Sequence, residues 1–216
     1  MAVRISASLA ASPLAHLAKS IAACEDAGVD LIHIDVEDGY FVPVMTLGTK
    51  IVAEVRPLTN LPLDVHLMMV SPEWLIPQLA KMGANRISVH WEACPYPRRT
   101  LRLISNLGIA AGLAFNPSTP IPELTYLLPY LKYVLLLTSE PEMPDCPFLP
   151  EVLQKVSNSK AITALAGVEW VVDGGVNAEN FGDCIRAGVD TIVIGRALFA
   201  NGEINQNMTR LKKAII

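Results

Sequence analysis

Residues 31–43 read LIHIDVEDGYFVP, an apolar run in which every second residue is polar until a turn begins at Asp38. Side chains of a β-strand alternate between its two faces, so His33, Asp35 and Glu37 share one face and apolar side chains share the other. Burying an imidazole and two carboxylates without partners costs much free energy. We therefore expect a metal ion here, with His33 and Asp35 as two of its ligands.

Strands of this kind recur along the chain in alternation with amphipathic helices, the pattern typical of a parallel sheet. We predict strands over residues 3–8, 31–37, 63–68, 86–92, 111–116, 133–139, 170–174 and 191–195. We predict helices over residues 13–27, 48–55, 72–82, 98–107, 151–157 and 178–187. Eight strand–helix units in 216 residues fit an α/β fold, a single-domain (β/α)8 TIM barrel over residues 1–216. A doubly wound sheet is the alternative, but no GxGxxG follows the first strand.

Four segments share a pattern in which a glycine follows a helix and precedes an apolar strand. They are AGVDLIHID (27–35), MGANRISVH (82–90), LGIAAGLAF (107–115) and AGVDTIVIG (187–195). Their glycines are Gly28, Gly83, Gly108 and Gly188. Glycine at this position can adopt the left-handed conformation that ends a helix. The repeat therefore supports helices that each lead into a new parallel strand.

Composition and charge argue against several classes of protein. Hydrophobic residues make up 51% and charged residues 18% of the chain, as in a well-packed globular protein. Charged residues and prolines interrupt every apolar run before it reaches the length of a membrane-spanning helix. The net charge of −4, without a basic cluster beyond two adjacent pairs, argues against a nucleic-acid partner. The four cysteines form no CxxC pair, so we expect reduced thiols in a cytoplasmic protein.

In barrels of this kind the reactive groups lie at the C-terminal ends of the strands. Three of the four histidines lie on predicted strands, and each shares a strand face with an acid. The pairs are His33 and Asp35, His66 and Asp64, and His90 and Glu92. Each pair taken alone is best explained as a core histidine hydrogen-bonded to a neighbour. Several pairs at the same end of successive strands favour a shared metal site.

Two imidazoles and two carboxylates form the expected ligand set: His33, Asp35, His66 and Asp173. This set suits Zn²⁺, Fe²⁺, Mn²⁺ or Co²⁺, and His90 and Glu92 are expected to orient the ligands. A metal that chelates a carbonyl and a neighbouring hydroxyl acidifies the C–H bond between them. One aspartate can remove that proton from one face, and the other can return a proton to the opposite face. We therefore expect inversion at carbon, with Asp35 and Asp173 as the two bases.

Glycines also follow the last two strands, at Gly174, Gly175 and Gly195. The backbone N–H groups of such glycines often bind a phosphate group in barrels. Glycines that only form turns are equally common. The spacing leaves both explanations open.

The motifs that carry these residues resemble the ribulose-phosphate 3-epimerase family over nearly the whole chain. They are ISASL, IHIDVEDGYFVP, LPLDVHLMMVSPE, ISVHWEA, GLAFNPSTP, VVDGGVNAEN and GRALF, in this order. The resemblance implies a (β/α)8 barrel that holds one divalent metal ion, commonly zinc or iron, and epimerises C3 of a ketose phosphate. It implies the same four metal ligands, Asp35 and Asp173 as the acid–base pair, and Ser8 as a substrate contact. The family is usually oligomeric, so a homo-oligomer is expected.

The chain departs from the family's pattern close to the expected site. The family usually has methionine at Glu37 and Leu137, histidine at Tyr40 and asparagine at Val44. Of three methionines implied to pack against the enediolate, only Met68 remains. Strand alternation points Glu37 into the site, where its charge would oppose a developing anion unless it is protonated or bound to the metal. It could also accept a hydrogen bond from a substrate hydroxyl, so altered substrate choice is as plausible as lost activity.

The loop after the sixth predicted strand departs further. The family typically has a glycine-rich NPGFGGQ there, which gives backbone amides to the phosphate, whereas residues 140–146 read EPEMPDC. Prolines remove N–H donors and the acids oppose an incoming anion. Arg196, where the family more often has serine, could restore a charged phosphate contact. A solvated loop without ligand contact is the alternative. We therefore expect a divergent paralogue acting on a different sugar phosphate or on an unphosphorylated sugar.

Three functions compete on these residues. The first is a metal-dependent sugar-phosphate 3-epimerase with substrate contacts from Ser8, His66, Met68, Gly174, Gly175, Gly195 and Arg196. The second is aldol cleavage or decarboxylation, but no strand-end lysine is placed for a Schiff base and the Asp-x-Lys-x-x-Asp of phosphate-binding decarboxylases is absent from the sequence. The third is a non-catalytic protein that binds metal or sugar phosphate.

Overall fold

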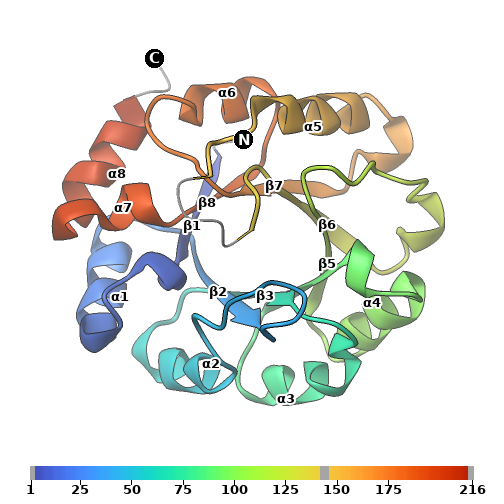
Figure 1. The fold of residues 1–216 in the computed structure, drawn as a ribbon, viewed down its shortest axis with the longest axis horizontal. Coiled ribbons are helices and arrows are strands. Elements are labelled where there is room, and N and C mark those ends of the chain that lie inside the picture. The colour runs from blue at the N-terminus through green and yellow to red at the C-terminus, as the bar shows by residue number, and fades with distance from the viewer. Residues whose placement is uncertain (1–2, 142–145, 214–216) are drawn as a thin grey trace.

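Eight parallel strands close into a barrel in the computed structural model, which describes residues 3–141 and 146–213 (Figure 1). Each strand pairs with the next one in the chain, and the last closes the ring against the first. The strands are β1 (Arg4–Ser8), β2 (Leu31–Glu37), β3 (Leu63–Met68), β4 (Arg86–His90), β5 (Ala110–Phe115), β6 (Leu131–Leu137), β7 (Glu169–Asp173) and β8 (Thr191–Ile194). The predicted (β/α)8 barrel is confirmed, and β2 and β3 have the predicted bounds.

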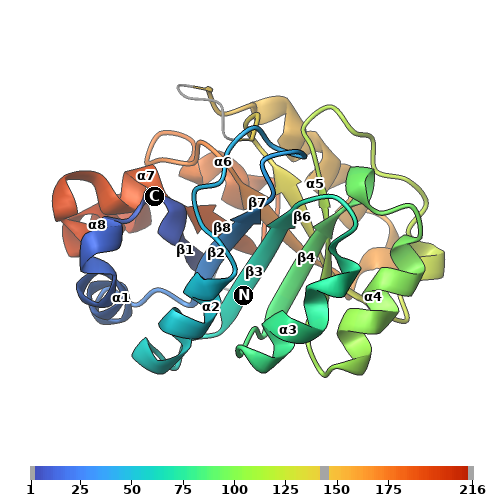
Figure 2. The same ribbon diagram turned by 60° about the horizontal axis from the view of Figure 1, so that its bottom comes forward.

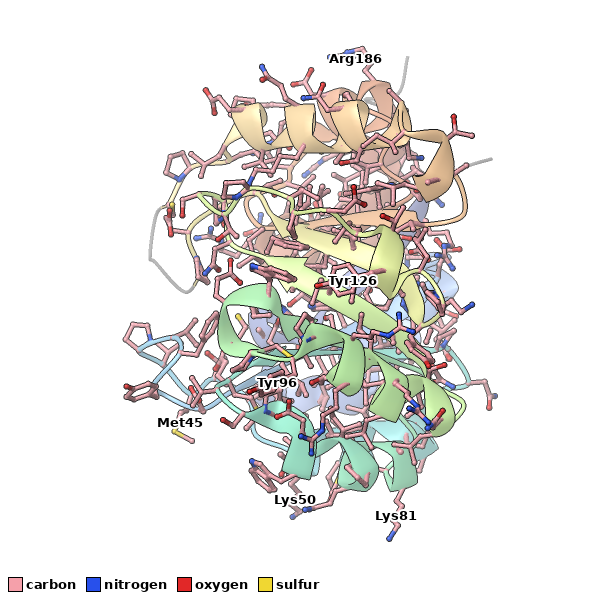
Figure 3. All side chains as sticks on the ribbon, turned by 90° about the vertical axis from the view of Figure 1, so that its right-hand side faces the viewer. Met45, Lys50, Lys81, Tyr96, Tyr126 and Arg186 are labelled. Atoms are coloured by element: carbon pink, nitrogen blue, oxygen red, sulfur yellow. The ribbon has the colours of Figure 1, made fainter. Side chains whose placement is uncertain are left out.

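Helices cover the outside of this barrel, as the two ribbon views show (Figures 1 and 2). They are α1 (Leu17–Asp26), α2 (Lys50–Val55), α3 (Ile76–Lys81), α4 (Pro97–Asn106), α5 (Leu153–Lys160), α6 (Phe181–Arg186), α7 (Arg196–Phe199) and α8 (Ile204–Lys213). The chain packs their apolar faces on the strands and leaves charged ends outside: Lys50, Lys81 and Arg186 point away from the barrel (Figure 3).

Four of the six predicted helices are shorter in the structure, namely those that correspond to α1, α2, α3 and α6. The helix predicted over residues 98–107 is shifted by one residue in α4, and the one predicted over 151–157 is one residue shorter than α5. Two further helices were not predicted. The predicted helix over residues 13–27 starts as a 3₁₀ turn at Leu14–His16 before α1, and the one over 72–82 starts as a 3₁₀ turn at Pro72–Trp74 before α3. The prediction ended at the eighth strand and therefore lacked α7 and α8. Among the described residues, no helix is both long enough and apolar enough to cross a lipid bilayer.

The four repeated segments end helices as predicted, because each glycine has a positive φ: Gly28 (74°), Gly83 (96°), Gly108 (77°) and Gly188 (87°). In three of these segments, the side chain of the residue two positions after the glycine also binds the backbone of a neighbouring strand. The side chains of Asp30, Asn85 and Asp190 accept hydrogen bonds of 2.8–2.9 Å from the backbone N–H groups of Ile5, Leu63 and Trp170. These hydrogen bonds therefore hold the first residues of β1, β3 and β7 against the segment that leads into the next strand of the barrel.

The hydrophobic core has two parts, separated by the strands themselves. The larger part fills the space between the strands and the helices, because each strand turns its apolar residues outward. The smaller part lies in one half of the barrel interior and consists of Ala114, Tyr133, Leu135, Leu137, Val171 and Val193. The other half of the interior contains buried polar side chains from β2, β3 and β4. The polar groups singled out in the sequence therefore lie inside the barrel.

A close approach inside the barrel makes Gly112 of β5 a test of this packing. A Cβ atom at position 112 would overlap the ring of Tyr133 on β6, which is fully buried and cannot move into solvent. We expect Gly112→Ala to lower the free energy of unfolding by about 1–3 kcal/mol, because overpacking displaces neighbouring side chains. Urea unfolding followed by circular dichroism measures this change.

The matched control is Gly167→Ala. Gly167 is exposed, and a Cβ atom there would have no heavy atom within 4 Å. Its free energy of unfolding should change by less than about 0.5 kcal/mol, as for most surface substitutions. Equal stabilities of the two variants would contradict the assigned packing of Tyr133.

Candidate active site

Four side chains bring their ligand atoms together inside the C-terminal half of the barrel. His33 and Asp35 come from β2, His66 from β3 and Asp173 from the end of β7. His33 Nε2 lies 3.1 Å from Asp35 Oδ1 and 3.5 Å from Asp173 Oδ2. His66 Nδ1 lies 3.1 Å and 4.0 Å from the same two oxygens. The structure thus brings together the four residues predicted as metal ligands, whose ligand atoms all lie within 4.8 Å of one another.

These separations fit a small divalent ion. Ligand atoms at about 2.0–2.2 Å from a tetrahedral Zn²⁺ lie roughly 3.4 Å from one another. The four His–Asp distances, 3.1–4.0 Å, bracket that value, and all pairs of ligand atoms lie within 4.8 Å. Two imidazole nitrogens and two carboxylate oxygens are also a donor set that zinc, iron, manganese and cobalt accept. The residues present therefore fit one divalent ion, without specifying which one.

Charges in the cluster interact strongly, because three of its members, His33, Asp35 and His66, are buried. Burial by itself would lower the pKa of His33, but Asp35, Asp173 and Asp64 surround the ring and raise it well above its ordinary value. Burial by itself would raise the pKa of Asp35, but His33 and His66 lower it far below its ordinary value. Asp35 is therefore ionised and attracts a cation. Without a metal, the proton on His33 supplies part of the positive charge that these carboxylates require.

The other nitrogen of His33 is held by Asp64 of β3. His33 Nδ1 lies 3.2 Å from Asp64 Oδ2, and both side chains are fully buried. The two residues are paired in the register between β2 and β3. A carboxylate on Nδ1 fixes the ring with its Nε2 lone pair toward the metal position. The strand pattern had suggested Asp64 as the neighbour of His66, and the structure corrects that partner to His33.

A second chain of contacts holds His66. Its Nε2 lies 2.9 Å from His90 Nε2, and His90 Nδ1 lies 3.2 Å from Glu92 Oε2. Burial lowers the pKa of His90 to about 4, so its ring is neutral and accepts the proton of His66 Nε2 while it donates Nδ1–H to Glu92. His90 and Glu92 thus occupy the orienting position that the sequence predicted. The strand predicted over residues 86–92 ends at His90, however, and Glu92 lies in the following 3₁₀ turn.

A cavity of about 1000 Å³ opens above the ligand cluster. It is lined by the two aspartates and by every predicted substrate contact except His66, namely Ser8, Asp35, Met68, Asp173, Gly174, Gly175, Gly195 and Arg196. The Ser8 hydroxyl donates a hydrogen bond of 3.1 Å to Asp35 Oδ2 and orients that carboxylate. His66 is fully buried and is not among the lining residues. The carboxylates of Asp35 and Asp173 therefore border the cavity, whereas the imidazoles of His33 and His66 do not.

Glu37 is placed differently from the position that strand alternation had suggested. Its side chain is buried at the end of β2, and Oε2 accepts a hydrogen bond from the backbone N–H of Thr46 in the following loop. Glu37 is not among the residues that line the cavity. Through Oε2, the Glu37 carboxylate thus stabilises the loop between β2 and α2. The other oxygen, Oε1, has no hydrogen-bond partner within the described residues.

The outer end of the cavity is built by the loops after β6, β7 and β8. Gly174 and Gly175 have φ values of 114° and 68°, and a Cβ atom at Gly174 would overlap Ser139. Both glycines are therefore required by the turn whether or not a ligand binds. Of the loop predicted to replace the glycine-rich lid, Glu140, Pro141 and Cys146 line the cavity, and residues 142–145 lie outside the described residues.

Comparison with known proteins gives a consistent result. The sequence model of the ribulose-phosphate 3 epimerase family matches residues 4–199. A ribulose-phosphate 3-epimerase of Bacillus subtilis is 39% identical over 213 residues, covering 97% of this chain and 98% of the relative. One from Synechocystis is 42% identical over 199 residues, covering 90% of this chain and 86% of the relative. A solved 3-keto-L-gulonate-6-phosphate decarboxylase from Vibrio cholerae shares the fold, with a TM-score of 0.69 at 17% identity over 100% of this chain and 98% of that chain.

Proposed function

Because the chain belongs to the ribulose-phosphate 3-epimerase family, we propose that it inverts C3 of a ketose phosphate with the help of one divalent metal ion. The observation that supports this reaction most directly is the position of Asp35 and Asp173. Both carboxylates face the same cavity and both lie within 3.5 Å of His33 Nε2. A proton can therefore be removed and returned by two groups within one site.

His33, Asp35, His66 and Asp173 would hold the ion. When bound, the ion would polarise the substrate carbonyl and its neighbouring hydroxyl and would lower the energy of the enediolate. Asp35 takes the C3 proton from one face of the substrate, and Asp173 delivers a proton to the other face. Ser8 keeps Asp35 Oδ2 in place, and Met68 and Leu137 give the cavity an apolar wall. A cytoplasmic location and a homo-oligomeric state stay predictions.

An unphosphorylated ketose is the second candidate substrate. Glu140 and Glu179 line the same cavity as Arg196, so two carboxylates border the space that a phosphate group would occupy. Like charges in a partly enclosed site oppose binding of an anion. This arrangement favours a substrate that carries less negative charge than a sugar phosphate.

Deuterium incorporation from D₂O separates these functions. Metal-loaded protein is incubated with matched pairs of free and phosphorylated ketoses, and the products are analysed by NMR. We expect deuterium at C3 of a ketose phosphate. Exchange in a free ketose alone would replace the phosphorylated substrate by the second candidate. The absence of exchange from every sugar, with the metal still bound, would contradict an epimerase and favour a binding protein.

A further inference from the structure

Three buried polar residues, Asp64, Arg86 and Tyr133, lie inside the barrel beneath the ligand cluster. None of them lines the cavity. Arg86 of β4 is 6% exposed, and its guanidinium carbon lies 4.1 Å from the ring centroid of Tyr133 on β6. The Tyr133 hydroxyl donates a hydrogen bond of 3.0 Å to Asp64 Oδ1. Arg86 Nε forms an ion pair with the same oxygen at 3.4 Å, without a hydrogen bond. Arg86 and Tyr133 therefore approach one oxygen of Asp64 together.

The two oxygens of Asp64 have different partners. Oδ1 faces Tyr133 and Arg86, while Oδ2 faces Nδ1 of His33 at 3.2 Å. Asp64 is fully buried, so bulk solvent does not compete for either oxygen. A carboxylate held at one oxygen has little freedom to rotate at the other. The orientation of the His33 ring thus depends on the contacts of Asp64 on the opposite side.

Arg86 is itself fixed from the N-terminal end of the barrel. Its Nη1 lies 3.0 Å and 3.1 Å from the two oxygens of Glu169, at the start of β7. Glu169 also contacts Arg4 Nη2 at 2.6 Å and accepts a hydrogen bond of 2.8 Å from the Thr191 hydroxyl. A continuous chain of contacts thus connects the N-terminal end of the barrel to His33.

Stability alone is a weak explanation for this group. Replacing a buried ion pair by apolar residues of similar volume often leaves stability unchanged or improves it. An apolar filling of the barrel interior would therefore serve the fold equally well. An apolar filling would not, however, hold Asp64 against His33.

We propose that Arg86 and Tyr133 are positioning residues of the metal site, which hold Asp64 so that the His33 ring directs Nε2 toward the metal. This inference rests on the metal dependence in the proposed function. Partners beyond the ligands of a metal site commonly change metal affinity by about 10–100-fold when they are replaced. We expect metal affinity to change within the same range here, because Arg86 and Tyr133 act on His33 through Asp64.

The test measures Zn²⁺ affinity by competition with a chromophoric chelator. Tyr133→Phe removes one hydroxyl and keeps the ring, and we expect affinity to fall by about 10-fold. Arg86→Met keeps the length of the side chain and removes its charge, and we expect a fall approaching about 100-fold. Arg86→Lys should recover part of the loss, because a cation remains beside Asp64.

A second pair of the same kind provides matched controls. Arg98 of α4 lies over the ring of Tyr130 at 5.2 Å, outside the barrel interior. Tyr130→Phe and Arg98→Met should leave Zn²⁺ affinity unchanged. Urea unfolding of all variants in the metal-free form gives their stability separately. The downfield proton resonance of His33 Nδ1–H in the zinc-loaded protein reports the hydrogen bond to Asp64 directly, and it should weaken in Tyr133→Phe and Arg86→Met but not in the controls.

The outcomes are distinguishable. Wild-type affinity and an unchanged His33 resonance in Tyr133→Phe and Arg86→Met would overturn the positioning role, whatever happens to their stability. If the variants lose affinity as expected but the wild-type protein exchanges no C3 proton, the proposed reaction fails and the positioning role stands. A wild-type protein that binds none of Zn²⁺, Fe²⁺, Mn²⁺ or Co²⁺ would overturn both.

Discussion

Replacing Asp173 by Asn is expected to lower kcat for C3 epimerisation by about 10²–10⁴-fold, the usual contribution of a general acid or base. The amide keeps the size of the side chain and one oxygen toward the cluster, but it cannot accept or deliver the proton. Because Asp173 lines the cavity at the end of β7 and is only partly buried, we expect the Asp173→Asn protein to keep its fold. Steady-state kinetics with the substrate identified by deuterium exchange measures this effect.

The Asp173→Asn experiment also separates the two halves of the reaction. If Asp173 serves one face only, the Asp173→Asn protein can still exchange the C3 proton of the epimer whose proton faces Asp35 while it completes no inversion. The matched control is Asp26→Asn at the exposed end of α1, which should retain the wild-type kcat. Wild-type turnover by the Asp173→Asn protein would show that Asp173 is not one of the two bases.

Replacing His33 by Gln is expected to have the largest effect on metal binding. The change removes a ligand atom from between Asp35 and Asp173 and removes the partner of Asp64. Zn²⁺ affinity should fall by more than about 100-fold, the upper end of the effect of an indirect partner. The metal-free protein should also lose about 3–5 kcal/mol of stability, because Asp35, Asp64 and Asp173 would each lose one buried partner, and only Asp64 keeps Arg86 as a buried cation. Chelator competition and urea unfolding measure the two effects.

His16→Gln is the control for this experiment. His16 is exposed in a 3₁₀ turn before α1, whereas the other three histidines of the chain are buried inside the barrel. Both its metal affinity and its stability should match those of the wild-type protein. If the His33→Gln protein binds Zn²⁺ as tightly as the His16→Gln protein, the four-residue cluster does not form the metal site.

The barrel and the four-residue cluster that could hold a metal could be predicted because the signals are local. The alternation from Leu31 to Glu37 fixes which side chains share a face of β2, and a glycine before each of four strands marks where the preceding helix ends. Strand ends in a parallel barrel meet at one rim, so ligands on β2, β3 and β7 could be combined without knowledge of their distances. The α8 helix carried a similar signal, with buried Ile204, Met208 and Leu211 at helical spacing, and could also have been found.

The contacts that orient His33 through Asp64 could not be predicted, because they depend on the register and closure of the barrel. His33 contacts Asp64 because β2 and β3 pair in a register that places these two residues side by side. Arg86 and Tyr133 meet although β4 and β6 are separated by β5. Glu37 was misplaced for a related reason, since its carboxylate contacts the backbone of Thr46 in a loop whose path the strand pattern does not describe.

The close approach of Gly112 to the Tyr133 ring also constrains how this protein can change over generations. A tyrosine at position 133 packs without strain only in a chain that has glycine at position 112. While the tyrosine is present, a larger residue at position 112 costs stability, and this cost falls if position 133 changes first. The effect of a substitution at either position therefore depends on the residue at the other, so the order of the two mutations matters.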